Sequence, residues 1–157
     1  AGVMIHPDGT PNVLEFNCRF GDPETQPILA RMRSDLTPLC EAALDGKLEG
    51  IKVDWDLRAA VGVVMAAGGY PDDMRKGDEI HGLDAAAKMP GKVFHAGTTL
   101  NAAGKVVTNG GRVLCAVGLG TTVRAAQKQA YELAGTICWE GLQYRKDIGY
   151  RAIARES

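Results

Sequence analysis

Three polar side chains stand two residues apart near the start of the sequence, in the stretch LEFNCRFGDPETQ that covers residues 14–26. Glu15, Asn17 and Arg19 alternate there with apolar residues. Because successive side chains of a strand point to opposite faces, we expect residues 14–20 to form a half-buried strand whose polar face carries all three groups. A carboxylate, an amide and a guanidinium on one face are suited to a ligand that combines a metal ion with an anion.

The carboxylate and the amide of this stretch fit a magnesium ion. Mg²⁺ prefers hard oxygen ligands and usually takes one or two of them from protein, with the rest from water and substrate phosphates. Glu15 and Asn17 supply such a pair, and Arg19 supplies donors for a carboxylate or a phosphate. An ordinary solvated strand face is the alternative interpretation.

A helix start follows the polar strand directly. Asp22 is a good N-cap, Pro23 suits the first helical position, and Glu24 places an acid in the first turn. The free N–H groups and the dipole at a helix N-terminus favour anions such as phosphate. Metal ligands, a guanidinium and an anion-binding helix end in one stretch therefore predict phosphoryl chemistry, which depends on positioning and on neutralising charge.

The composition describes an ordinary globular chain. Its 157 residues are 45% hydrophobic, which suits one domain, or a small domain plus a piece of another. Eighteen basic and nineteen acidic residues give a formal net charge of −1, which argues against a partner that is nucleic acid or a membrane surface. The four cysteines lie far apart without a C-x-x-C pair, and we interpret them as reduced thiols of a cytoplasmic protein. No apolar run approaches the roughly 18 residues of a transmembrane helix.

The first fifty residues must position the polar strand. A turn at 7–9 joins it to an earlier strand-like run, which predicts a β-hairpin. The helix that begins at Asp22 is expected to be short or kinked because of Pro27. Ser34 is the expected N-cap of a second helix, which stops at Gly46. Since the sequence begins without Met and directly on a strand-like run, we expect it to be a fragment of a longer protein.

A second unit is expected after a charged linker. Four strand-like runs are predicted at 59–67, 92–100, 105–109 and 111–119. Glycine-containing turns at 103–104 and 109–111 indicate antiparallel hairpins between the last three. A helix capped by Thr122 and ending near Gly135 follows, with an apolar stripe for the core. There are no internal repeats.

Two further patterns have competing interpretations. Gly118-x-Gly120 runs from a strand into a helix, as in a dinucleotide-binding turn, but Val123 occupies the third glycine position and the remaining chain is too short for a parallel fold. We therefore prefer a strand-to-helix connection. His6, His81 and His95 share no metal-ligand spacing, which favours structural or solvent roles.

The C-terminal end of the chain carries a small basic group. This group is interpreted either as an ordinary solvated surface or as a phosphate-binding pocket. The group comprises Tyr144, Arg145, Lys146, Arg151 and Arg155.

Five motifs occur in a fixed order along almost the whole chain. They are EFNCRFGDPETQ (15–26), GVVMAAGGYP (62–71), KVFHAGT (92–98), VVTNGGRVLC (106–115) and KDIGYRAI (146–153). Together they resemble the last third of the phosphoribosylamine–glycine ligase family of ATP-grasp enzymes. The resemblance implies an α+β fold: the C-terminal part of an ATP-grasp domain over 1–50, with a β-hairpin, helices and the metal-binding strand. A small antiparallel β-rich domain with a flanking helix is implied over 57–157, like the family's C-domain.

The resemblance also implies an activity, a carbon–nitrogen ligation in purine biosynthesis. ATP phosphorylates the carboxylate of glycine, and the amine of 5-phosphoribosylamine attacks the glycyl phosphate to give glycinamide ribonucleotide, ADP and phosphate. By this resemblance Glu15 and Asn17 are ligands of Mg²⁺ or Mn²⁺ that bridge the metal to the phosphates of ATP. From the chemistry, Arg19 would steady the transferring phosphoryl group, and Asp22 would help to position substrate. Lys146 and Arg151 are the candidates for the ribose 5-phosphate, by analogy with related ligases.

The phosphate loop, the adenine site and most of the glycine site of the family lie outside this sequence. We therefore expect the chain to need the N-terminal remainder of the same enzyme as its partner and to be inactive alone, because catalysis requires the whole constellation. Two alternatives stay open. One is a fragment of another ATP-grasp ligase, and the other is a noncatalytic structural domain.

Overall fold

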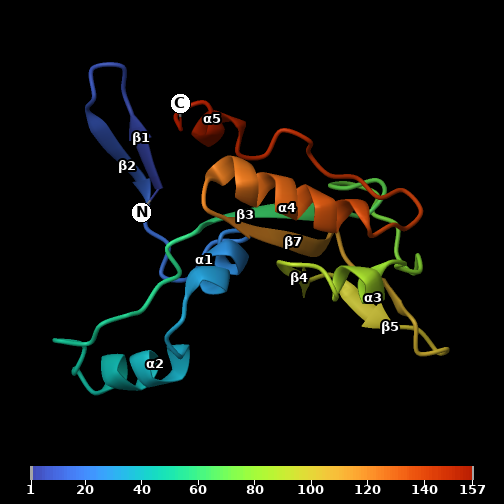
Figure 1. Ribbon diagram of the computed structural model, residues 1–157, viewed down its shortest axis with the longest axis horizontal. Helices are drawn as coiled ribbons and strands as arrows, with labels where there is room; N and C mark the ends of the chain where they lie inside the picture. Colours follow the sequence, from blue (N-terminus) through green and yellow to red (C-terminus); the bar gives the residue numbers. More distant parts are fainter. Residues whose placement is uncertain (1, 157) are drawn as a thin grey trace.

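The computed structural model describes residues 2–156 and has the α+β fold expected from the sequence (Figure 1). Its centre is a three-stranded antiparallel sheet in the order β3-β7-β4. The strands are β3 (Ala59–Ala66), β7 (Arg112–Gly120) and β4 (Lys92–His95). Helix α4 (Val123–Gly135) covers one face of this sheet, and helix α1 (Thr25–Arg31) lies against the other.

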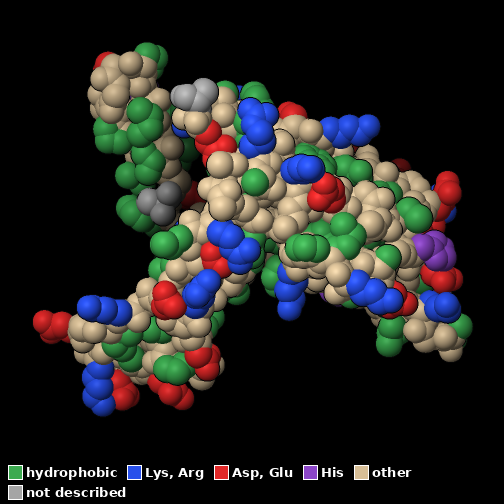
Figure 2. Space-filling view, in the orientation of Figure 1, with side chains coloured by type: hydrophobic (Ala, Val, Ile, Leu, Met, Phe, Trp, Pro, Cys, Tyr) green, Lys and Arg blue, Asp and Glu red, His purple; other side chains and the backbone are tan. Residues whose placement is uncertain are grey.

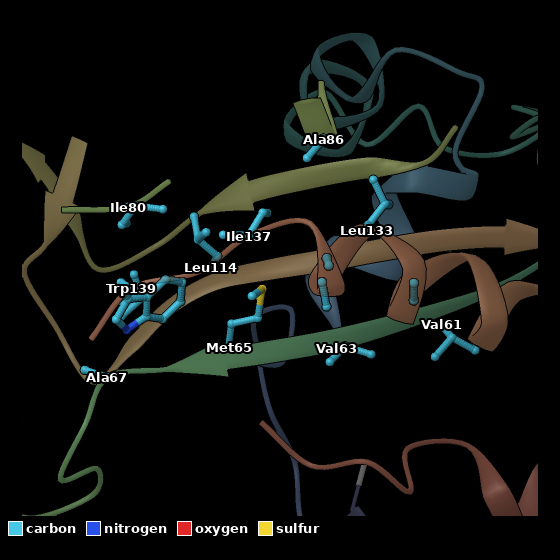
Figure 3. Packing of buried hydrophobic residues seen from close by; sticks show 14 of the residues in the cluster. Val61, Val63, Met65, Ala67, Ile80, Ala86, Leu114, Leu133, Ile137 and Trp139 are labelled. Carbon is cyan, nitrogen blue, oxygen red and sulfur yellow. The ribbon is translucent and has the colours of Figure 1, made fainter. Parts of the chain in front are cut away.

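Alternation along β3 decides which side chains meet α4. Val61, Val63 and Met65 are buried on the helix side, as Figure 3 shows. In the β3–β7 register Met65 stands opposite Leu114, and Val63 stands opposite Ala116. Each fully buried side chain of this size contributes about 1.5–3 kcal/mol of transfer free energy. The buried core cluster and the apolar residues packed on it all lie between residues 59 and 148.

Helix α4 forms where the sequence predicts it. Thr122 caps the helix, since its hydroxyl accepts a hydrogen bond of 3.1 Å from the N–H of Ala125. The carboxylate of Glu156 accepts from two further N–H groups of the first turn, those of Val123 and Arg124. The buried stripe of the helix consists of Ala126, Ala130, Leu133 and Ala134.

Gly118 and Gly120 allow α4 to lie directly on β7. A Cβ atom on Gly118 would lie 2.3 Å from the carbonyl oxygen of Ala126, and one on Gly120 would lie 2.4 Å from the nitrogen of Ala126. Strand β7 is antiparallel to both of its neighbours, so the glycines serve close helix packing and do not form a dinucleotide-binding turn. The preference for a simple strand-to-helix connection is confirmed.

The predicted strand at 92–100 is broken, and the predicted hairpin turn at 109–111 is wrong. Strands β4 and β5 (Thr98–Leu100) run antiparallel to β7 and β6 (Val106–Thr108), so the whole segment is one long bent hairpin. The bend lies where Gly97 meets Gly110, and a Cβ on Gly97 would lie 2.8 Å from the Cα of Gly110. Residues 109–111 therefore turn a corner between two sheets, while the tight turn of the hairpin follows Asn101.

Two short helices complete the second half of the chain, α3 (Leu83–Ala86) and α5 (Tyr150–Ile153). The segment between α4 and α5 runs along the outer edge of β3, where Ala66 and Gln143 exchange backbone hydrogen bonds of 2.8 and 3.1 Å. Across residues 2–156, no helix combines the length and the apolar character that crossing a bilayer requires.

The N-terminal hairpin differs from its prediction. It consists of β1 (Gly2–Ile5) and β2 (Pro11–Glu15), and it extends away from the central sheet (Figure 1). The expected half-buried strand over 14–20 is wrong: β2 ends at Glu15, whose partner is Gly2, and every residue from 11 to 20 is exposed. The alternating pattern does not continue as a strand because no described residue pairs with the chain beyond Glu15.

The two N-terminal helices begin later than predicted. Helix α1 starts at Thr25 instead of Asp22, since residues 22–24 form turns. Pro27 then occupies the third helical position, where its missing N–H costs no internal hydrogen bond. Helix α2 (Leu36–Leu44) is capped by Asp35, which accepts from the N–H of Thr37, and not by Ser34.

The irregular segment after α2 is fastened to α1 at Asp56. This carboxylate is largely buried, lies 2.7 Å from the guanidinium of Arg58 and 3.5 Å from that of Arg33. Backbone hydrogen bonds link the N–H of Asp56 to the carbonyl of Arg31, and the N–H of Arg33 to the carbonyl of Asp54. These contacts form the Asp56 latch, which joins the end of α1 to the start of β3.

Candidate functional site

Glu15 and Asn17 lie side by side, as the chemistry of a metal site requires. The amide nitrogen of Asn17 donates to Oε1 of Glu15 over 3.0 Å. This contact leaves Oε2 of Glu15 and Oδ1 of Asn17 without partners among the described residues, so each of the two exposed side chains keeps one free hard oxygen. That number matches what Mg²⁺ usually takes from protein. Within residues 2–156 no three His, Cys, Asp or Glu side chains are grouped to hold a metal, so an ion here needs its other ligands from elsewhere.

Arg19 does not join this pair. Its guanidinium is exposed, and Nη1 donates to the carbonyl oxygen of the next residue, Phe20, over 3.1 Å. The prediction that Arg19 shares one strand face with the acid and the amide is wrong, because β2 has already ended at Glu15. The role of Arg19 toward a phosphoryl group stays a prediction.

Asp22 lies at a second place, beside β7. Nη1 of Arg112 donates to the backbone carbonyl of Asp22 over 2.9 Å and lies 3.3 Å from its carboxylate. Nε of the same guanidinium donates to the hydroxyl of Tyr70 over 3.2 Å. Both contacts raise the pKa of Arg112 above its ordinary value, the hydroxyl contact first. Arg112 thus joins the turn before α1 to the loop after β3.

This junction borders a cavity of about 590 Å³ on the face of the sheet that α4 does not cover. Gly62, Val64 and Ala66 of β3 form an apolar floor. The remaining lining comes from four separate segments. It consists of Pro23, Tyr70, Arg112, Gln143, Tyr144, Arg145 and Ile148. The volume and the mixture of an apolar floor with a few polar groups are typical of small-molecule sites.

Close packing fixes the position of Tyr70, which forms one wall of the cavity. The side-chain amide of Gln143 donates to the carbonyls of Ala67 and Tyr70 over 3.0 and 3.1 Å. Gly111 gives room for the phenol ring, since a Cβ there would lie 2.5 Å from Cδ2 of Tyr70. A ligand would therefore meet a wall whose geometry is set in advance.

Arg145 stands on another wall of the cavity. Its guanidinium makes two hydrogen bonds of 2.9 and 2.8 Å with the carboxylate of Asp147, which lowers the pKa of that carboxyl below its usual range. The hydroxyl of Tyr131 donates to the backbone carbonyl of Arg145 over 2.7 Å and so anchors the segment to α4.

The predicted phosphate contacts, Lys146 and Arg151, are both exposed and do not line this cavity. Arg151 lies over the ring of Tyr150, 5.6 Å from its centre, and donates to the phenol oxygen. Their role is not tested by this geometry and stays a prediction. Two other members of the same basic group, Tyr144 and Arg145, do line the cavity.

Sequence reasoning missed Arg112, Tyr70 and Gln143 as site residues. Arg112 falls within the run at 111–119, which was interpreted only as a strand, and its contact with Tyr70 joins positions 42 residues apart. One available signal was the basic group at the C-terminal end. Short-range patterns carry no information on how that end lies against β3.

The antiparallel sheet, its covering helices and the cavity define a small α+β unit with a ligand-sized site. The family described as phosphoribosylglycinamide synthetase, C domain, matches residues 60–151, which is more than half of the chain. The chain belongs to this family.

Curated relatives and a solved structure agree with this membership. A phosphoribosylamine–glycine ligase of Yersinia pestis is 64% identical over 155 residues, and one of Pseudomonas putida is 62% identical over 156 residues. Each alignment covers 99% of this chain. The crystal structure of a phosphoribosylamine–glycine ligase from Thermotoga maritima matches 93% of this chain with a TM-score of 0.71 and 41% identity. The chain spans only 36% of the length of the two curated ligases and 35% of the Thermotoga chain.

Proposed function

We propose that the chain is the C-terminal part of a phosphoribosylamine–glycine ligase, an ATP-dependent carbon–nitrogen ligase of purine biosynthesis. The whole enzyme joins glycine to 5-phosphoribosylamine through a glycyl phosphate and releases ADP and phosphate, in the cytoplasm. Family membership and the names of the relatives support the proposal. The observation in the structure that carries it is the hydrogen-bonded Glu15–Asn17 pair, in which each side chain keeps one free hard oxygen.

In this proposal Glu15 and Asn17 hold Mg²⁺ or Mn²⁺ against the phosphates of ATP. One carboxylate and one neutral amide keep the protein's charge at the metal low, which leaves the metal's positive charge for the phosphates. The metal, when bound, neutralises charge on the transferring phosphoryl group. Arg19 follows two residues later and supplies a guanidinium for the same group, while Asp22 at the turn before α1 positions substrate.

The N-terminal remainder of the enzyme is the proposed partner of the exposed hairpin and of α2. Large apolar side chains are exposed throughout these elements, and Figure 2 shows them in green along the hairpin at the upper left. The most exposed include Leu14 at 66% and Leu44 at 89%. Such surfaces in one region mark an interface, because water contact of large apolar areas is unfavourable. The nucleotide loop and the adenine site would lie in this partner segment.

The test compares the complete protein with the isolated chain. The complete protein should release phosphate from ATP only when glycine, phosphoribosylamine and Mg²⁺ are all present, and residues 1–157 alone should release none. Alanine in place of glycine is the matched substrate control. Turnover by the isolated chain, or a complete protein that prefers another carboxylate, would contradict the proposal.

A further inference from the structure

The cavity beside β3 combines an apolar floor with two cations. Gly62, Val64 and Ala66 offer no polar atoms beyond their backbone, whereas Arg112 and Arg145 bring guanidinium groups from separate segments. A ligand with a carbon frame and one strongly anionic end suits this lining. A pentose monophosphate has that composition, and the cavity of about 590 Å³ has room for it.

Arg112 has hydrogen-bond donors that none of the described residues uses. Its Nε and Nη1 are engaged with Tyr70 and Asp22, while Nη2 bonds to none of the described residues. The hydroxyl of Tyr70 accepts from Arg112, so its own proton stays available to an acceptor. Three N–H or O–H donors therefore lie within one rigid corner, which suits the several oxygens of a phosphate.

Arg145 supplies the second cation in the same way. Nε and Nη2 form the fork with Asp147, and Nη1 has no bonded partner in the part of the chain that the structure describes. Its backbone is tied to Tyr131 on α4, so the base of the side chain is fixed even though the guanidinium is exposed.

The carboxylates that accompany these arginines are weak competitors for a phosphate. The side chains of Asp22 and Asp147 are 71% and 53% exposed, and ion pairs that are open to water contribute little. A phosphate dianion carries more charge than one carboxylate and offers more acceptor oxygens. A phosphate in the cavity that both arginines line can therefore displace these carboxylates, which turn toward water.

We infer that the Arg112–Arg145 cavity binds the phosphate of the amine substrate, a pentose monophosphate, with Tyr70 as a third donor. This assignment rests on the proposed function, since that reaction supplies the sugar phosphate. It makes Arg112 and Arg145 the phosphate contacts in place of Lys146 and Arg151. It also sets the substrate near Asp22, which contacts Arg112.

The test is a titration of the complete protein with ribose 5-phosphate, followed by NMR and calorimetry. Ribose 5-phosphate should shift resonances of the cavity lining, and ribose without the phosphate should not. Arg112→Gln and Arg145→Gln should each weaken binding at least tenfold, and Arg112→Lys should recover part of it. Arg124→Gln, an exposed arginine of α4 outside the cavity, is the matched control and should change nothing.

Other results would overturn the inference. One such result is that ribose 5-phosphate does not bind at all. Another is that Arg112→Gln and Arg145→Gln both leave the affinity unchanged. A third is that Arg151→Gln lowers the affinity for ribose 5-phosphate while Arg112→Gln does not. Arg145→Gln serves as the second variant if Arg112→Gln loosens the Tyr70 loop. Binding is measured without turnover, so its failure is separable from failure of the proposed function. A complete protein that ligates while Arg112→Gln and Arg145→Gln both leave its affinity for ribose 5-phosphate unchanged refutes the inference alone, and a complete protein without ligase activity refutes the proposed function.

Discussion

Asn17 has two roles in the proposed metal site that no other residue type combines as well. Its amide nitrogen fixes Glu15 through a hydrogen bond of 3.0 Å, and its amide oxygen stays available to a cation. An aspartate at 17 would repel Glu15 and could not donate to it, and a leucine would offer no oxygen. The pair is therefore organised by the chain itself before any metal arrives.

This arrangement predicts a magnesium phenotype in the complete enzyme. Glu15→Gln or Asn17→Ala should lower the rate at least tenfold at limiting Mg²⁺, because each change removes an oxygen ligand or its support. Excess Mg²⁺ should restore part of the rate, as a weakened site is filled by mass action. The measurement is the rate as a function of Mg²⁺ concentration. Asn12→Ala, on the same hairpin, is the matched control, and an unchanged Mg²⁺ dependence in Asn17→Ala would refute the ligand assignment.

At the scale of elements, local sequence predicts well only where local contacts decide the structure. Helix α4 was predictable from Thr122 to Gly135, because its cap and its apolar stripe are both short-range features. The contact between Glu15 and Asn17 follows from their spacing of two residues, although the strand that was expected to carry both is wrong. The end of β2 was not, since a strand extends only as far as its partner does. The Arg112 cavity was not either, because its lining comes from segments that only the fold brings together.

The Asp56 latch should make stability depend on pH. Hydrogen bonds and charge from Arg58, followed by Arg33, hold the pKa of Asp56 well below its usual 3.8. A carboxyl whose pKa is lowered by folding stabilises the protein above the pKa of the unfolded chain, and that contribution is lost as pH falls toward the folded value. Asp56→Asn should therefore lower the free energy of unfolding at pH 5–7. The difference in this free energy between the variant and the parent chain should shrink below about pH 4.

Chemical denaturation of both chains across pH 2–7 measures this effect. Asp54→Asn is the matched control, because the side chain of Asp54 has no ion pair among the described residues, and it should follow the parent curve at every pH. A gap between Asp56→Asn and the parent that stays constant down to pH 2 would show that the latch acts by packing and not by charge.

The contact between α4 and β7 gives a second prediction at this scale. Gly118→Ala should destabilise the chain by about 1–3 kcal/mol, because the new methyl group would overlap the helix backbone at Ala126. Gly135→Ala, in the last turn of α4, is the matched control: no heavy atom lies within 4 Å of its Cβ position, and alanine is the better helix former. Urea denaturation should show loss of stability in the first variant and none in the second.

On the scale of the whole molecule, the chain divides its apolar side chains unevenly. The core cluster and its packed neighbours lie between residues 59 and 148, whereas most of the large exposed apolar residues precede residue 58. Among the described helices and strands of the earlier part, α1 makes the main contact with the central sheet, where Pro27 and Cys115 both approach Gly62. The later part is thus expected to fold alone, and the earlier part to need the rest of the enzyme.

A truncated chain that starts at Leu57 should therefore unfold cooperatively but lose the cover over Cys115. In the 157-residue chain, burial, together with the charge of Asp22, raises the pKa of this thiol to about 11, so it should react slowly at pH 8. Cys18, Cys40 and Cys138 are exposed and should react fast.

In the 57–157 chain both remaining thiols, Cys115 and Cys138, should react fast, because α1 and Asp22 are gone. Timed labelling with a thiol reagent measures this; continued protection of Cys115 would show that α1 is not its cover, and a truncated chain without cooperative unfolding would refute independent folding.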